Sequence, residues 1–205
     1  AIVLAKQHHS AGDLQKAHRI YRQVLQSDPR QADAMHYLGL IAYQVGKPEE
    51  AVGLIERALD IEPNVAEAHN HLGLCLHSMG RLADAVASFQ QAVSLDEVFA
   101  EAFSNLASAL NDQGAIEEAV TNYRRALAIN PKSAQTYYNF AAALNDAGRI
   151  DEAGENYRIA ITISPNFAEA HNNLGGIYMN LRRFDEAEVC YQTAIKIQPD
   201  SSEAH

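Results

Sequence analysis

The sequence predicts an all-α protein built as a stack of helical hairpins. The first observation is a period of 34 residues, which returns the same residue types along the whole chain. The second is the pattern inside each period, where two apolar runs at helical spacing flank a turn and a proline usually follows the second run. Self-similarity at a period of about 20–50 residues is typical of repeat architectures. We therefore expect six helix pairs, each packed mainly against its neighbours.

The segment 100–133 shows the repeat most completely. Its marker residues are Leu106, Ala107, Gly114, Ala119, Tyr123, Ala126 and Pro131. If the closing proline is numbered position 32, position 20 is alanine in all six periods and position 24 is always large. Small residues let two helices approach closely, while large ones fill the space between them. Both columns therefore indicate contacts within one helix pair.

The turn between the two helices is marked by glycine in five of the six periods, at Gly12, Gly46, Gly80, Gly114 and Gly148. Glycine adopts the left-handed conformation that ends many helices. Arg182 stands at this point in the sixth period. We expect that turn to be either differently built or slightly strained.

These columns resemble the tetratricopeptide repeat (TPR) family over essentially the whole chain. The resemblance implies a right-handed superhelical solenoid of antiparallel helix pairs, forming a single domain over 1–205. The expected repeats are 1–31 (partial), 32–65, 66–99, 100–133, 134–167 and 168–201, with 202–205 beginning a truncated seventh. Neither end shows a polar capping helix, which natural arrays usually need. This predicts a piece of a longer polypeptide, with possible end-to-end self-association through uncapped terminal helices.

Composition excludes several classes of function. The net charge of −10 argues against nucleic acid, whose phosphates require a basic surface. The sequence shows no apolar run of membrane-spanning length. Cys75 and Cys190 lie at unrelated positions of different repeats, so no disulfide framework is implied and we expect a cytoplasmic protein. We expect no enzyme activity, cofactor or metal, because the histidines and cysteines show no known ligand or catalytic spacing.

TPR proteins bind ligands in a concave groove lined by the first helix of each repeat. From residue 32 onward, the corresponding stripe contains no Lys or Arg, so the carboxylate clamp of chaperone-binding TPR domains is absent. Asn105, Asn139 and Asn173 instead occupy one column, which resembles the asparagine ladder of the TPR region of O-linked N-acetylglucosamine transferase. An asparagine both donates and accepts hydrogen bonds, so it can pair with a peptide backbone. The alternative is that these side chains satisfy neighbouring helices or solvent.

The sequence thus predicts a non-catalytic scaffold that binds an extended peptide or protein segment in its concave groove. The candidate peptide-binding residues are Asn70, His71, His77, Asn105, Asn111, Tyr138, Asn139, Asn145, Asn172 and Asn173. Two alternatives remain open. One is a substrate-recruiting TPR domain of a larger enzyme such as a glycosyltransferase, and the other is a self-assembling TPR scaffold.

Overall fold

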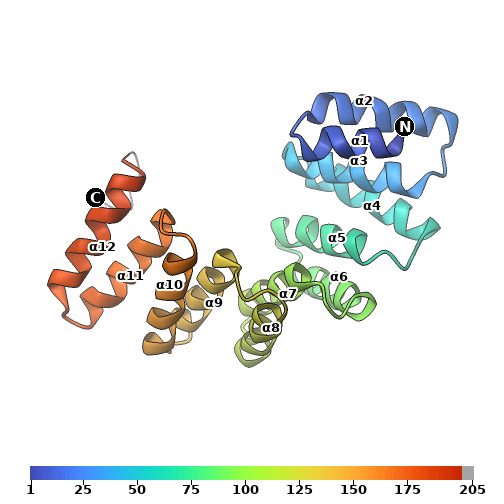
Figure 1. The fold of residues 1–205 in the computed structure, drawn as a ribbon. Coiled ribbons are helices and arrows are strands. Elements are labelled where there is room, and N and C mark those ends of the chain that lie inside the picture. Colours follow the sequence, from blue (N-terminus) through green and yellow to red (C-terminus); the bar gives the residue numbers. More distant parts are fainter. Residues whose placement is uncertain (200–205) are drawn as a thin grey trace. The chain divides into compact units, whose positions relative to one another are not determined.

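The structure, a computed structural model, describes residues 1–199 and is all-α over that range (Figure 1). Its helices are α1 (Ile2–Ser10), α2 (Leu14–Ser27), α3 (Ala32–Gln44), α4 (Pro48–Ile61), α5 (Ala66–Ser78), α6 (Leu82–Leu95), α7 (Ala100–Asp112), α8 (Ile116–Ile129), α9 (Ala134–Asp146), α10 (Ile150–Ile163), α11 (Ala168–Asn180) and α12 (Phe184–Ile197). The residues expected to begin a seventh repeat, 202–205, lie outside the described part of the chain.

The helices belong to two compact units, Ala1–Gln113 and Gly114–His205. In the first unit, α1 packs on α2, α3 on α4 and α5 on α6, while α7 packs on α5 and α6. In the second unit, α9 packs on α10 and α11 on α12, with α8 against α9. The prediction of an all-α array of helix pairs is therefore confirmed. The single-domain organisation and the hand of the superhelix remain predictions.

The core of each unit follows the repeat columns. The alanines at position 20 are buried in every pair, as Ala51 and Ala153 show with 0% exposure. The large residues at position 24 lie beside them, and Phe89 is 1% exposed. A Cβ atom added at Gly73 would lie 2.6 Å from the Phe89 ring, well inside contact distance. Glycine is therefore required at residue 73, where the Phe89 ring packs directly over the helix backbone.

The turn inside each pair has one geometry, including the one that lacks glycine. At Gly148 (φ 75°), two backbone hydrogen bonds close the turn. The Gly148 N–H donates to Asn145 O, and the Arg149 N–H donates to Leu144 O. Arg182 takes φ 57° and makes the matching bonds, from its N–H to Met179 O at 3.0 Å and from Arg183 N–H to Tyr178 O at 2.8 Å. The turn is thus not differently built. A non-glycine residue occupies the left-handed region, which costs roughly 1–2 kcal/mol.

Proline is not required to end the second helix. α4 ends at Ile61, two residues before Pro63, and α6 ends at Leu95, two residues before Glu97. At the end of α6, the Asp96 carboxylate accepts a hydrogen bond from the Val98 N–H at 3.0 Å. A side chain that bonds to the backbone two residues on makes a turn without proline.

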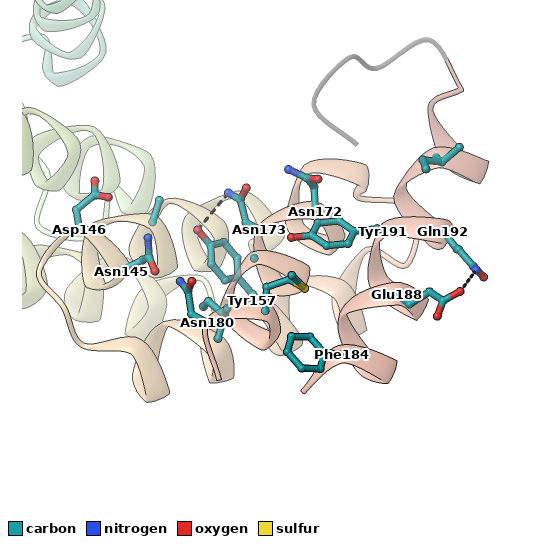
Figure 2. A pocket seen from close by; sticks show the side chains of 15 residues that line it. Asn145, Asp146, Tyr157, Asn172, Asn173, Asn180, Phe184, Glu188, Tyr191 and Gln192 are labelled. Atoms are coloured by element: carbon teal, nitrogen blue, oxygen red, sulfur yellow. Dashed lines mark hydrogen bonds between the residues drawn. The ribbon is translucent and has the colours of Figure 1, made fainter. Parts of the chain in front are cut away.

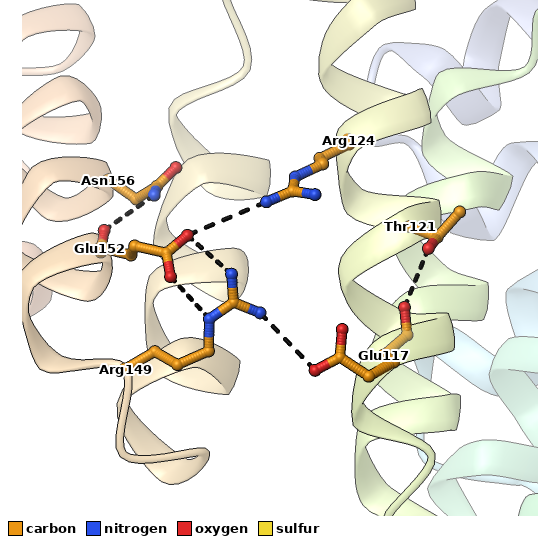
Figure 3. A network of polar contacts seen from close by, with 6 residues as sticks. All are labelled: Glu117, Thr121, Arg124, Arg149, Glu152 and Asn156. Atoms are coloured by element: carbon orange, nitrogen blue, oxygen red, sulfur yellow. Dashed lines mark hydrogen bonds and ion pairs between the residues drawn. The ribbon is translucent and has the colours of Figure 1, made fainter.

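Charged residues connect second helices of the second unit (Figure 3). Arg149, just before α10, makes two bonds of 2.7 Å to Glu152, and it approaches Glu117 of α8 at 3.8 Å. Arg124 of α8 reaches Glu152 at 3.9 Å. The hydrogen bonds from Arg149 hold the pKa of the Glu152 carboxyl below its usual value. Because Glu117, Arg124 and Glu152 are exposed, the network contributes little to the stability of the fold.

Candidate functional site

The first helices of the first unit form a continuous polar face, since α1, α3, α5 and α7 contact one another in succession. Side chains on this face pair across repeats at a constant separation of 35 residues. The pairs are His9–Gln44 at 2.9 Å, His36–His71 at 2.7 Å, Asn70–Asn105 at 3.0 Å and His77–Asp112 at 2.7 Å. We call these side chains the polar ladder. One repeat plus one residue therefore separates the partners of each pair.

The His36–His71 pair is a largely buried rung of the polar ladder. His36 is 2% exposed, and burial lowers its pKa to about 3, with His71, Lys6 and His9 adding repulsion. Burial also lowers the pKa of His71, against the opposing effect of Glu67. Both imidazoles are therefore neutral at neutral pH. One ring nitrogen donates to the other, so His36 Nε2 and His71 Nδ1 are paired without an external partner.

Further polar contacts link side chains of α1, α3 and α5 on the same face. Lys6 forms an ion pair with Asp33 at 3.1 Å, and its ammonium lies 4.5 Å from the centroid of the Tyr37 ring. The Tyr37 hydroxyl donates to Glu67 at 2.8 Å. Burial and this bond both raise the pKa of Tyr37. The polar groups of α1, α3 and α5 are thus largely occupied by one another.

The predicted ligand residues of the first unit differ from one another in burial and in hydrogen bonding. Asn70 was expected to face an open groove, but it is 0% exposed and accepts a hydrogen bond from Asn105. His71, His77 and Asn105 are half-buried members of the polar ladder. Asn111 carries a buried Oδ1 that has no partner within residues 1–199. Packing of α5 against α7 explains the burial of Asn70, since the two helices lie in direct contact.

The second unit contains a groove of about 770 Å³ between α9, α10, α11 and α12 (Figure 2). Its lining residues are Ala142, Asn145, Asp146, Tyr157, Asn172, Asn173, Gly176, Ile177, Met179, Asn180, Phe184, Glu188, Tyr191, Gln192 and Ile195. Three of the predicted ligand residues, Asn145, Asn172 and Asn173, therefore meet at one site. The polar groups come mainly from α9 and α11, whereas α12 adds Phe184, Tyr191 and Ile195.

Hydrogen bonds orient one wall of this groove. Asn173 donates from Nδ2 to the hydroxyls of Tyr138 and Tyr157, both at 3.2 Å. The Tyr138 ring packs on Tyr157 and on Phe167. Asn139 lies outside the groove lining, and its Oδ1 accepts a bond from Gln135 of the same helix at 2.9 Å. The rung Tyr138–Asn173 repeats the 35-residue separation of the polar ladder.

Asn172 differs from every residue of that wall. Its Oδ1 is buried and has no hydrogen-bond partner in the described part of the chain. Buried polar atoms are almost always paired, so an unpaired acceptor needs an explanation. Asn172 lies at the same repeat position as Asn70, yet its amide borders an open groove instead of a neighbouring first helix.

The groove is acidic. Asp146 and Glu188 are the charged residues among those lining it, and no Lys or Arg is found in that set. Glu188 accepts a bond from Gln192 at 2.9 Å. Burial raises the pKa of Tyr157 to about 12, so its hydroxyl stays protonated beside them. The surface therefore favours ligands that carry hydrogen-bond donors or positive charge.

Models of known protein families match most of the chain. Models described as "Tetratricopeptide repeat" match residues 3–66 and 38–97 and, separately, 168–201, and a model described as "TPR repeat" matches 107–146 and 143–181. The chain belongs to the tetratricopeptide repeat family. No curated protein sequence matches it significantly.

Solved TPR structures resemble the chain in fold. PilF of Pseudomonas aeruginosa has a TM-score of 0.84 at 20% identity, covering 99% of this chain and 92% of that one. A MamA structure has a TM-score of 0.70 at 27% identity, covering 82% of this chain and 92% of that one. YrrB, described as a TPR protein with an unusual peptide-binding site, has a TM-score of 0.67 at 21% identity, covering 90% and 95%.

Several residues of the TPR groove were missed by sequence reasoning. Tyr157, Tyr191 and Glu188 line it from second helices, although the expected ligand surface was confined to first helices. Tyr157 and Tyr191 occupy position 24, which was interpreted as core. Phe184, at the start of α12, is 58% exposed, and an aromatic at that turn was the signal available in the sequence.

Neither cysteine of this TPR array is activated as a nucleophile. Cys75 is 0% exposed, and burial raises its pKa to about 11. Burial also raises the pKa of Cys190. A nucleophilic cysteine needs the opposite shift. Within residues 1–199, no three His, Cys, Asp or Glu side chains are grouped to hold a metal ion, and no helix is long and apolar enough to cross a membrane.

Proposed function

We propose that this TPR array is a non-catalytic scaffold that binds an extended polypeptide segment in the groove of the second unit. The observation that carries the proposal is the buried, unpaired Oδ1 of Asn172 at the edge of a groove of about 770 Å³. A backbone N–H of a bound segment would satisfy this acceptor. Leaving such an atom unpaired costs about 1–3 kcal/mol, which a ligand can recover.

The lining supports a polypeptide rather than a compact small molecule. Asn145, Asn172 and Asn180 offer amides that pair with a backbone whatever its side chains are. Met179 and Phe184 are 45% and 58% exposed and provide apolar contacts beside them. The fold neighbour YrrB is itself described by its peptide-binding site. Alternating polar and apolar contacts of this kind suit an extended chain.

The charge of the groove favours a segment with neutral or basic side chains. Asp146 and Glu188 line it, and the chain as a whole carries a net charge of −10. A basic segment would be attracted from a distance and then held by hydrogen bonds to the amides.

The test begins with a display library of random peptides selected on the full chain. Selected peptides are then titrated against the wild type and Asn172→Ala. Loss of one hydrogen bond, worth about 0.5–1.5 kcal/mol, should weaken binding roughly two- to twelvefold. The matched control is Asn156→Ala, because Asn156 bonds only to the Glu152 carbonyl of its own helix, away from the groove.

The expected result is weaker binding by Asn172→Ala and unchanged binding by Asn156→Ala. Equal affinities for all three proteins would show that the groove is not the binding site. Failure of the library to yield any specific peptide would also contradict the proposal.

A further inference from the structure

A cationic surface on α2 lies in the first unit, apart from the proposed peptide groove. The sequence of α2 contains Lys16, His18, Arg19 and Arg22 and no Asp or Glu. Each of the other five second helices has at least one acidic residue in its first turn. The whole chain has 26 acidic residues against 16 Lys and Arg, so this surface opposes the overall charge.

Two arginines of this surface have no partner. Arg19 and Arg22 are exposed and lie one turn apart. Their guanidinium groups make no ion pair or hydrogen bond within residues 1–199. Lys16 on the same helix, by contrast, is paired with Asp13 at 2.8 Å. Like charges three residues apart on a helix repel each other. A carboxylate placed between the two guanidinium groups would relieve this repulsion.

The arginines border a groove of about 680 Å³ between α2 and α3, which we call the α2 groove. Its lining residues are Leu14, Gln15, His18, Arg19, Arg22, Gln23, Gln26, Ile41 and Val45. Leu14, Ile41 and Val45 give it an apolar part, and Val45 is 55% exposed. Arg22 also lines an adjoining hollow of about 370 Å³, whose other charged residues are Arg57 and Glu50. Cationic and apolar contacts are thus available side by side.

We propose that the α2 groove binds an acidic polypeptide segment of a partner protein. Carboxylates of the segment would contact Arg19 and Arg22, because a guanidinium matches a carboxylate in two parallel hydrogen bonds. Apolar side chains of the segment would contact Val45 and Leu14. A polypeptide is favoured over nucleic acid because a phosphate backbone has no apolar group to place against Leu14, Ile41 and Val45.

The probe is a short fluorescein-labelled peptide of repeated Glu-Glu-Leu triplets, titrated into the full chain and followed by fluorescence anisotropy. The test variant is Arg19→Gln/Arg22→Gln. The matched control is Lys132→Gln/Lys196→Gln, which removes the same charge from the second unit, where neither side chain contacts the α2 groove. A peptide of Gln-Gln-Leu triplets serves as the uncharged probe, and a short oligo(dT) serves as the nucleic-acid probe.

The wild type and the lysine control should bind the acidic peptide equally. Arg19→Gln/Arg22→Gln should bind it about tenfold more weakly, a factor that corresponds to about 1.4 kcal/mol and lies within the range expected for two exposed charge pairs. Binding should weaken as salt is added. The thermal stability of the arginine variant should not fall, because neither guanidinium has a partner to lose.

Three results would overturn the proposal. Equal binding by the arginine variant and the wild type would place the acidic peptide elsewhere. Tighter binding of oligo(dT) than of the acidic peptide would make the surface a nucleic-acid site. Absence of measurable binding of the acidic peptide to the wild type would leave Arg19 and Arg22 as solvated surface charges. None of these outcomes affects the groove of the second unit, whose test uses Asn172.

Discussion

Mild acid should destabilise the first unit through the His36–His71 rung. The two rings share one hydrogen bond of 2.7 Å, and His36 is 2% exposed. Protonation of the accepting nitrogen would leave two N–H groups, on His36 Nε2 and His71 Nδ1, facing each other. Lys6 and His9 add positive charge nearby, whereas Glu67 acts in the opposite direction on His71. The folded state therefore resists protonation that the unfolded chain accepts freely.

The pKa values give the size and the direction of the effect. His36 has a folded pKa of about 3 against 6.5 for an unperturbed histidine. As the pH falls below 6.5, the unfolded state binds protons first, so stability is full above this value and is lost between it and a pH of about 3. At about pH 5, His36 alone removes about 2 kcal/mol from the free energy of unfolding. The lowered pKa of His71 acts in the same direction.

A rung of the same polar ladder suggests a variant for comparison with the wild type. His36→Asn/His71→Asn reproduces the Asn70–Asn105 rung, which occupies the same two repeat positions one repeat later. Urea unfolding followed by circular dichroism should be measured for both proteins at about pH 7 and about pH 5. The wild type should lose about 2 kcal/mol more than the variant over this interval. Equal losses in the two proteins would refute the assignment of a neutral, buried histidine pair.

Two further substitutions test the ladder and the turns. Asn105→Ala should lower the free energy of unfolding by about 1–3 kcal/mol, because it removes the hydrogen-bond partner that the structure gives Asn70; unchanged urea unfolding would mean that the rung is not structural. Arg182→Gly should raise the melting temperature through about 1 kcal/mol of relieved backbone strain, since φ 57° suits glycine; a lower melting temperature would show that the arginine side chain stabilises the turn.

The repeat pattern could be predicted from the sequence because its columns are fixed by contacts inside one helix pair. Ala119 and Tyr123 lie on one helix, and both are at most 2% exposed in the structure. Such contacts depend on residue size and helical spacing, which a sequence displays directly. The turn at Arg182 was left between two possibilities, because a sequence does not state backbone angles. The structure selects the strained form.

The state of each polar side chain was decided only by the tertiary structure. Asn70 and Asn172 share one repeat position, and each has one buried amide atom without a partner in residues 1–199. Asn70, however, is 0% exposed and accepts a hydrogen bond from Asn105, whereas Asn172 borders an open groove. The difference depends on which side chain the neighbouring helix brings into contact. Hydrogen bonds across repeats form only when the helices pack, and residue identity alone does not reveal which side chains will be paired. The sequence therefore determined the array and its candidate amides, whereas packing decided which amides remain available to a ligand.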